Sequence, residues 1–331
     1  MNNLITVAQI GCGYWGPNLL RNLMASDECV VKTVVDIDQG RRNYVKRFYP
    51  SVDVTDNVQR IFEDQSINAV VIATPVATHF DLAIQALKSE KHILLEKPMA
   101  RTVTEVEQIG ILAKRNNLIA MVGHTFLYNA AVRYLKKLIE SGELGDIRYI
   151  YSQRLNLGRI RTDVDVLWNL GPHDISIIQY LLGNQTPILI EKYGMDYVQN
   201  GIYDVVFMKI IYPSKIMVHI HLSWLDPRKV RQMTVVGSKK MVIYDDLADN
   251  KITIYDKGID KMAVLGERMD FDKSAFPKFN YRSGDVISPK INFEEPLKTE
   301  ISHFFDCIQN GKECLTNSEH AKEVVRILSR L

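Results

Sequence analysis

Several features that would indicate other classes of protein are missing from this sequence. Its 331 residues contain no apolar run near the ~18 residues of a membrane span, and a typical run, residues 69–73, ends after a few positions. Lysine and arginine (41 together) nearly balance aspartate and glutamate (39 together), and no basic cluster that could follow a phosphate backbone occurs. We therefore expect neither a membrane nor a nucleic acid as a partner.

Cysteine is also scarce. The sequence has no CxxC pair and no spacing typical of a metal site, and its 4 cysteines are Cys12, Cys29, Cys307 and Cys314. We interpret them as reduced cysteines of a cytoplasmic protein. The apolar residues 4–10 lack the basic segment and cleavage site of a signal peptide. His219 and His221 alternate on a strand-like run without a third ligand, so we expect no metal site.

The length predicts about two domains, and the first 125 residues show an alternating pattern. Short apolar runs, typical of strands, occur at residues 4–10, 30–35, 69–73, 92–95 and 119–122. Helix-like segments occur at residues 15–25, 39–48, 80–89 and 104–116. This order predicts an α/β Rossmann domain, with a doubly wound parallel sheet covered by helices on both faces.

In residues 126–331 the alternating pattern gives way to mainly strand-like runs. These residues are predicted to form a second, α+β domain with an open, mostly antiparallel sheet. A helix is expected at 130–141 and another at 172–182, and two more, at 297–309 and 318–331, close the chain. Turns are expected at 212–215 and 226–228, and a long loop at 257–296. Strands are expected at residues 147–156, 188–198, 203–212, 215–224 and 230–236.

A complete G-x-G-x-x-G follows the first predicted strand, at residues 11–16. The glycines Gly11, Gly13 and Gly16 would permit a tight turn, a close approach to a pyrophosphate and close helix–strand packing. Asp36 ends the next strand, 20 residues past Gly16, where a carboxylate can accept hydrogen bonds from a ribose. The alternative is a simple turn with Asp36 capping a helix. The combination favours dinucleotide binding.

The same carboxylate bears on the choice of cofactor. Asp36 would repel a 2′-phosphate, which favours NAD over NADP, although Arg41 and Arg42 could neutralise a phosphate nearby. Two further loops, at 73–75 and 96–98, follow strands at the edge where ligands of such sheets collect. Lys97 there is either half of a surface pair with Glu96 or a group that polarises a substrate oxygen.

These motifs together resemble a known family. Gly-Cys-Gly-Tyr-Trp-Gly-Pro-Asn-Leu (11–19), Ala-Thr-Pro (73–75), Glu-Lys-Pro (96–98), Gly-His-Thr-Phe (123–126), Leu-Trp-Asn-Leu-Gly-Pro-His-Asp (167–174) and Glu-Pro-Leu (295–297) occur in order. The sequence is similar to the glucose–fructose oxidoreductase/inositol dehydrogenase/rhizopine catabolism (Gfo/Idh/MocA) family. The resemblance implies a cis Lys97–Pro98 peptide, catalytic roles for Lys97 and His173, and hydride transfer at a secondary alcohol.

The motifs, the charged residues and the resemblance together give the predicted binding residues. The substrate contacts that we predict are Lys97, Asn129, Arg154, Arg161, Asn169 and His173. The cofactor contacts that we predict are Gly11, Gly13, Tyr14, Trp15, Gly16, Asp36, Ile37, Arg41, Thr74, Pro75, His79, Glu96, Lys97 and Asn129.

Alternatives remain for several of these residues. His173 could be a capping residue in the first turn of a helix at 172–182, and Asn129 a helix N-cap. Arg154, Arg159 and Arg161 could clamp a diphosphate or form a solvated rim. Trp168 could line the sugar pocket or fill core space.

One position departs from the inositol dehydrogenase pattern. Those members carry an aspartate four residues before the catalytic histidine, whereas this chain has Asn169. A neutral amide orients an imidazole without raising its pKa, so His173 would be a weaker base. Three explanations are open: a more acidic substrate hydroxyl, an enzyme that works mainly as a reductase, or a protein that binds without turnover.

The particular residues at these motifs resemble those of family members that act on nucleotide-linked sugars. We therefore expect an NAD-dependent oxidoreductase acting at C3 of a UDP-N-acetylglucosamine(uronate)-like or dTDP-sugar-like substrate, in surface-polysaccharide or deoxysugar biosynthesis. The alternatives are a free-polyol (inositol) 2-dehydrogenase and a catalytically silent NAD- or sugar-binding regulator. Apolar residues alternate along 203–211, which predicts a homodimer or homotetramer formed through the C-terminal sheet.

Overall fold

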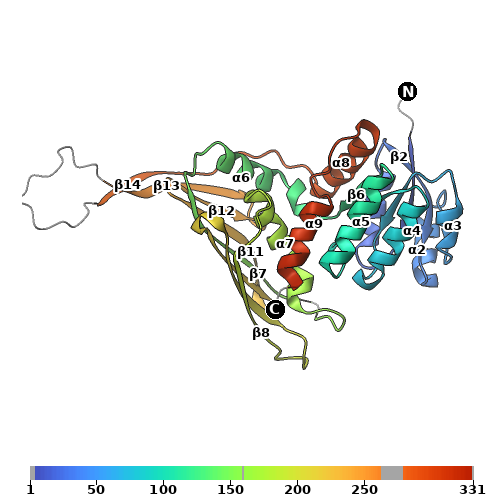
Figure 1. Cartoon of the computed structure of the whole chain (residues 1–331), viewed down its shortest axis with the longest axis horizontal. Helices are drawn as coiled ribbons and strands as arrows, with labels where there is room; N and C mark the ends of the chain where they lie inside the picture. Colours follow the sequence, from blue (N-terminus) through green and yellow to red (C-terminus); the bar gives the residue numbers. More distant parts are fainter. Residues whose placement is uncertain (1–3, 159, 262–278, 330–331) are drawn as a thin grey trace, which may run out of the picture. The chain divides into compact units, whose positions relative to one another are not determined.

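The computed structural model describes residues 4–158, 160–261 and 279–329 (Figure 1). Two compact units are present, and neither is continuous in sequence. The first contains Met1–Ala130, Leu167–Gln185 and Phe293–Leu331, and the second contains Ala131–Val166 and Thr186–Asn292. The two closing helices thus group with the N-terminal sheet. A division of function at residue 125 stays a prediction.

The first unit is built on a parallel sheet, as predicted, and its six strands lie in the order β3-β2-β1-β4-β5-β6. The strands are β1 (Ile5–Ile10), β2 (Cys29–Val35), β3 (Asp53–Thr55), β4 (Ala69–Ile72), β5 (His92–Leu95) and β6 (Ala120–Val122). Every residue of β4 and β6 is buried, as expected where helices cover both faces of a parallel sheet. The strand order reverses between β1 and β4, so the carboxyl ends of these strands border a crevice.

The helices of this unit come from both ends of the chain (Figure 1). Helix α5 begins with a capping box, because Thr102 accepts the Glu105 N–H while Glu105 accepts the Thr102 N–H. Near the C-terminus, α9 packs on α5 and α8 packs on α1. The helices are α1 (Gly16–Met24), α2 (Gln39–Phe48), α3 (Gln59–Glu63), α4 (His79–Lys88), α5 (Val103–Arg115), α7 (Val166–Leu181), α8 (Pro296–Asn310) and α9 (Ser318–Ser329).

The second unit contains an eight-stranded sheet in the order β14-β13-β12-β11-β7-β10-β9-β8, together with helix α6 (Ala130–Glu140). All neighbours are antiparallel except β7 and β10, which confirms the mostly antiparallel prediction. The strands are β7 (Ile147–Leu157), β8 (Leu189–Met195), β9 (Val205–Ile211), β10 (Met217–Ser223), β11 (Leu225–Gly237), β12 (Met241–Asp245), β13 (Ile252–Lys261) and β14 (Phe279–Ile287).

Some predicted elements need correction. The short β3 and α3 were missed because 3 and 5 residues hold too little periodicity. The loop expected at 257–296 is confirmed only at residues 288–295, since β13 runs to Lys261 and β14 covers Phe279–Ile287; residues 262–278 lie outside the described ranges. The turn expected at 226–228 is an irregularity within β11, where the pairing with β7 shifts between Leu225 and Val230.

The turn predicted at 212–215 is confirmed, since Pro213–Lys215 forms a short 3-10 turn with Ser214 at φ 64°. Helix α7, in contrast, begins at Val166, so Pro172 lies inside it. His173 is therefore an interior helix residue, and its interpretation as a first-turn cap is wrong. No helix within the described ranges combines the length and apolarity needed to cross a bilayer.

Candidate active site

Three loops leave the parallel sheet at the carboxyl ends of β1, β4 and β5. They hold residues 11–15, 73–75 and 96–98, and the parallel pairing of β1 with β4 and of β4 with β5 brings them to one edge. All three motifs predicted to bind a cofactor therefore lie together in the first unit.

Each glycine of the first loop meets a different constraint. Gly11 has φ +93°, and a Cβ there would lie 2.6 Å from the Ala73 carbonyl oxygen. A Cβ on Gly16 would lie 2.6 Å from the Gly11 carbonyl oxygen. A Cβ on Gly13 would meet nothing within 4 Å. Gly11 and Gly16 thus serve packing, while the space beside Gly13 lets a pyrophosphate approach the backbone.

Helix α1 starts directly after this loop. Its N-cap residue, Trp15, makes no side-chain cap hydrogen bond within the described chain. The N–H groups at a helix N-terminus and the helix dipole together attract a phosphate. The loop and the start of α1 therefore fit the pyrophosphate of a dinucleotide.

Asp36 follows β2 and is tied to the glycine loop. Its carboxylate accepts the Cys12 N–H at 2.6 Å and the Asp38 N–H at 2.9 Å. The side chain is half-buried, so part of it faces outward, where a ribose hydroxyl could reach it. Arg42 is engaged nearby, since its Nη1 donates to the Asp36 carbonyl at 2.7 Å, whereas Arg41 is exposed.

Apolar side chains project into solvent around the same loop. Tyr14 is 82% exposed, Ile37 is 89% exposed and Trp15 is 38% exposed. Exposed large apolar groups beside a nucleotide loop suit the stacking of a ring.

Cys12, in contrast, is buried, and desolvation together with Asp36 raises the pKa of its thiol to about 11. The thiol is therefore protonated at neutral pH.

The second loop is braced by His79. Its Nδ1 lies 2.9 Å from the Pro98 carbonyl oxygen and its Nε2 lies 2.9 Å from the Thr74 carbonyl oxygen. Burial lowers the pKa of His79, so the ring is neutral and donates to one of these carbonyls at a time. His79 thus joins the loops after β4 and β5, and its predicted contact with a cofactor stays a prediction. Thr74 shares a hydrogen bond with Thr78 at 2.7 Å, next to Pro75.

The third loop carries Lys97. The Lys97–Pro98 peptide is cis, as the family resemblance predicts. Lys97 Nζ donates to the main-chain carbonyl of Asn169 in α7 at 2.8 Å. His173 lies one helical turn after Asn169 on the same helix, with its ring edge-on to Phe126 at 5.0 Å between centroids. Lys97, in the loop after β5, thus contacts the helix that carries His173, and the catalytic roles of both residues stay predictions.

Two carboxyl groups that face Gly123 lie beside this lysine. Burial raises the pKa of Glu96 to about 7, and the Lys97 charge partly opposes the rise. Glu300, from α8, is fully buried, and burial together with Glu96 raises its pKa well above the usual range. A Cβ on Gly123 would lie 3.3 Å from Glu300 Oε1 and 3.4 Å from Glu96 Oε1. Burial therefore favours the protonated form of Glu300.

Two neutral histidines complete these surroundings. His124 and His320 are both buried and meet edge-on at 5.3 Å between ring centroids. Burial lowers the pKa of His320 to about 4. Burial, His320 and the Lys97 charge lower the pKa of His124 well below its usual range. Burial thus favours the neutral forms of both histidines.

The remaining predicted residues are less tightly defined. Asn129 is buried between the turn Thr125–Tyr128 and α6, and Trp168 packs against the apolar core of the first unit. Arg154 is buried in β7 of the second unit, where Arg161 forms a two-point ion pair with Asp163 at 2.6 and 2.8 Å. Arg159 lies outside the described residues. A diphosphate clamp stays a prediction.

Glu300 and His320 were not among the sequence candidates, although Glu300 carried a usable signal. It lies among apolar helix positions with Leu297, Ile301 and Phe304, where a charged residue is unusual. His320 gave a weaker signal in the sequence, because a histidine on a helix does not stand out unless its neighbour His124 is known to lie beside it.

Known proteins provide an independent comparison. Residues 5–124 match the family described as "Oxidoreductase family, NAD-binding Rossmann fold", and residues 132–243 match the "GFO/IDH/MocA C-terminal domain". The scyllo-inositol 2-dehydrogenase (NAD(+)) of Bacillus subtilis is 25% identical over 327 residues, which cover 94% of this chain and 88% of that protein.

Solved structures agree in fold. The UDP-N-acetylglucosamine 3-dehydrogenase GnnA of Acidithiobacillus ferrooxidans superposes with a TM-score of 0.78 at 20% identity, covering 98% of this chain and 96% of that one. GenD2 from gentamicin A biosynthesis, solved in complex with NAD, gives a TM-score of 0.80 at 19% identity, covering 98% and 92%. Together with the glycine loop and Asp36, the two family matches show that this chain belongs to the Gfo/Idh/MocA family of oxidoreductases, which have an NAD-binding Rossmann domain.

Proposed function

We propose that this protein is an NAD-dependent dehydrogenase or ketoreductase acting at a secondary alcohol, C3, of a nucleotide-linked sugar. The observation that supports it best is the hydrogen bond of Lys97 Nζ to the Asn169 carbonyl at 2.8 Å, one helical turn before His173. This contact supports the proposal that Lys97 and His173 act as proton-carrying groups beside the dinucleotide. Bound NAD supplies the acceptor or donor of hydride.

The chain's own residues move the proton. When the alcohol is oxidised, its hydroxyl proton passes to the imidazole of His173, and the Lys97 ammonium stabilises the negative charge that develops on the oxygen. In reduction both steps reverse, and the new hydroxyl receives its proton from the same groups. Asn169 gives His173 no negative charge, so the imidazolium is stabilised less than it would be beside an aspartate. This favours the reductive direction.

The proposed substrate class is supported by the residues of the sequence motifs and by the fold shared with GnnA. Its rival is a free polyol, which the scyllo-inositol dehydrogenase from Bacillus subtilis supports across 94% of this chain. A turnover assay with NAD and separate UDP-sugars, dTDP-sugars, inositols and hexoses decides between them. Turnover of a nucleotide sugar alone supports the proposal, and turnover of inositol alone replaces it. The panel includes a keto-acid acceptor and the reverse reaction, since tightly held NADH could hide turnover.

The roles of Lys97 and His173 are tested by substitution. We expect Lys97→Met and His173→Gln each to lower kcat by roughly 10²–10⁴-fold with little change in NAD affinity. Lys114→Met removes an exposed lysine from α5 and serves as the control. Full turnover in Lys97→Met contradicts the proposed role. Tight NAD binding without turnover of any substrate by the unmodified protein would favour the silent regulator.

We also propose a preference for NAD over NADP. The Asp36 carboxylate faces the predicted ribose position, and Arg42 is already bonded to the Asp36 carbonyl and paired with Asp56 at 3.5 Å. A 2′-phosphate would therefore meet a negative charge. We expect Asp36→Ser to weaken NAD binding and improve the use of NADP, measured as kcat/KM for each cofactor. An unchanged NAD/NADP ratio contradicts this assignment.

The second unit is proposed to form a homodimer or homotetramer through its sheet. The strand register places Tyr149 beside Met217, Tyr151 beside His219, and Phe207 beside His221, so these residues share one face. Tyr149, Tyr151, Phe207 and Met217 are all exposed. An exposed apolar sheet face of this kind is typical of an interface. Light scattering on Phe207→Glu should show a smaller species, and an unchanged mass contradicts the proposal.

The four free cysteines agree with a reducing compartment, and we propose a cytoplasmic location.

A further inference from the structure

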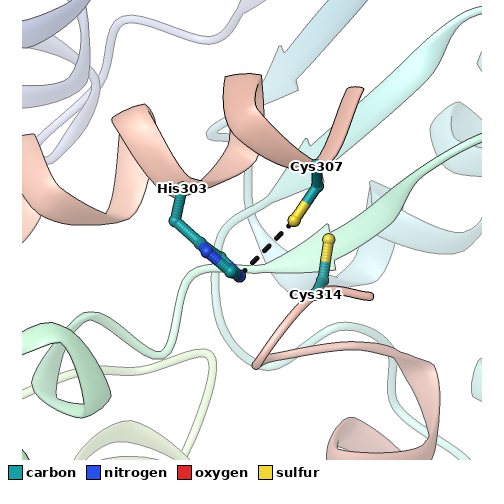
Figure 2. A group of neighbouring side chains, drawn as sticks. All are labelled: His303, Cys307 and Cys314. Carbon is teal, nitrogen blue, oxygen red and sulfur yellow. Dashed lines mark hydrogen bonds between the residues drawn. The ribbon is translucent and has the colours of Figure 1, made fainter. Parts of the chain in front are cut away.

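A cluster of soft ligands lies at the far end of α8, separate from the groups around Lys97. His303 and Cys307 are four residues apart on the helix, so they share one face. The helix ends at Gly311, whose φ of 63° turns the chain back and brings Cys314 to the same point. Figure 2 shows the imidazole and the two sulfur atoms directed toward one another.

The distances between these atoms fit a tetrahedral ion. His303 Nε2 and Cys307 Sγ are 3.5 Å apart, and all three ligand atoms lie within 4.8 Å of one another. Zinc bonds of about 2.3 Å to sulfur and about 2.05 Å to nitrogen separate the two ligands by about 3.6 Å at a tetrahedral angle. Two thiolates on the same ion stand about 3.8 Å apart. Binding therefore requires only small movements.

The surroundings hold the three side chains in place. Both cysteines are buried and His303 is half-buried, with its ring 5.5 Å from that of Tyr128. The segment after Cys314 is fixed to the sheet, because the Val122 N–H donates to the Thr316 carbonyl at 2.9 Å. The Leu315 N–H donates to His303 Nε2 at 3.0 Å. An ion would replace this last hydrogen bond.

We propose that His303, Cys307 and Cys314 bind one thiophilic divalent ion of the zinc class, with a water or other solvent ligand in the fourth position. Binding releases the protons of thiols that are still protonated. The ion joins the end of α8 to the segment that pairs with β6, so its role is to fix this corner of the fold. This proposed site differs from the expectation of no metal site, which considered only the spacing of cysteines and histidines along the chain. The proposal is independent of the function proposed above.

Cobalt(II) titration of the reduced, full-length protein tests it, because thiolate–cobalt bonds absorb in the near ultraviolet. We expect one tightly bound Co²⁺ per chain, with charge-transfer absorption that Zn²⁺ displaces. Cys307→Ser and Cys314→Ser should lower the affinity at least 100-fold, and His303→Gln at least 10-fold. Cys29→Ser and His92→Gln are the matched controls, since Cys29 is buried and His92 Nδ1 accepts the Ile119 N–H.

Each other outcome overturns the proposal. Absence of the charge-transfer band in the unmodified protein shows that the cluster binds no such ion, whatever the folding of the variants. Equal binding by Cys29→Ser and Cys307→Ser places the ion elsewhere. Freshly purified protein that is about 2 Da lighter under non-reducing conditions, with neither Cys307 nor Cys314 alkylated, identifies a disulfide pair instead.

Discussion

The buried carboxyl group of Glu96 should make stability depend on pH in a way that one substitution removes. Its pKa in the folded protein is about 7, against an ordinary value of 4.5. Between these values the folded chain keeps a proton that the unfolded chain loses, so the free energy of unfolding falls as pH rises. The difference of about 2.5 units, at 1.36 kcal/mol each, corresponds to about 3 kcal/mol.

Glu96→Gln keeps the shape of the side chain and carries no proton equilibrium. We expect the variant and the unmodified protein to differ little at pH 4 and the variant to be more stable by about 3 kcal/mol at pH 8. Urea unfolding from pH 4 to 8 measures this difference. The histidines with lowered pKa, His124 and His320 among them, oppose the trend below pH 6.5, but they are present in both proteins and cancel in the difference.

Glu294→Gln removes an exposed glutamate and should follow the unmodified protein throughout. A difference between Glu96→Gln and the unmodified protein that stays constant from pH 4 to 8 would refute the reasoning. Glu300 contributes in the same direction, because burial raises its pKa, and neutralising Glu96 removes only the smaller cause of that rise. The double variant should therefore show the flattest profile.

Three further predictions concern the fold around the site. Gly11→Ala should destabilise the protein by about 1–3 kcal/mol, because its φ is positive and its Cβ would meet the Ala73 carbonyl. Gly13→Ala should leave urea unfolding nearly unchanged but weaken NAD binding in calorimetry, since its Cβ would occupy only the open space; equal effects of the two variants on folding contradict this. Thr102→Ala should cost about 1 kcal/mol of unfolding free energy through loss of the α5 cap, and no change would show that the capping box is not stabilising. Phe304→Ala should cost about 3–5 kcal/mol, whereas Phe293→Ala, at an exposed position, should change stability by less than about 0.5 kcal/mol.

The sequence predicted most of the first unit because its pattern is local. Strand β5 and helix α2 occur at the predicted residues, and the glycine loop precedes α1 as expected. The predicted element boundaries were wrong at two prolines, because neither proline ends its helix or strand. Pro172 suggested a helix start, yet packing keeps it inside α7, and Pro227 suggested a turn where β11 continues past an irregularity.

The site was predicted in part, again because part of its pattern is local in the sequence. Asp36, Lys97 and His173 belong to motifs that can be read along the chain. Glu300 and His320, in contrast, belong to helices and lie more than 200 residues after Lys97 in the chain. The cluster of His303, Cys307 and Cys314 was missed because its spacing depends on the left-handed turn at Gly311.

The groups around Lys97 suggest how its charge is used. Burial favours the neutral forms of His79, His124 and Glu300, so in the proposed mechanism the Lys97 ammonium would act on a substrate oxygen without a full opposing charge from them. Glu96 changes this balance as it ionises near pH 7, because its carboxylate then competes for the ammonium. We therefore expect ketone reduction to slow above pH 7 in the unmodified protein and to slow less in Glu96→Gln, measured as kcat between pH 6 and 9. The same decline in both proteins would show that the proton donor, rather than Glu96, sets the profile.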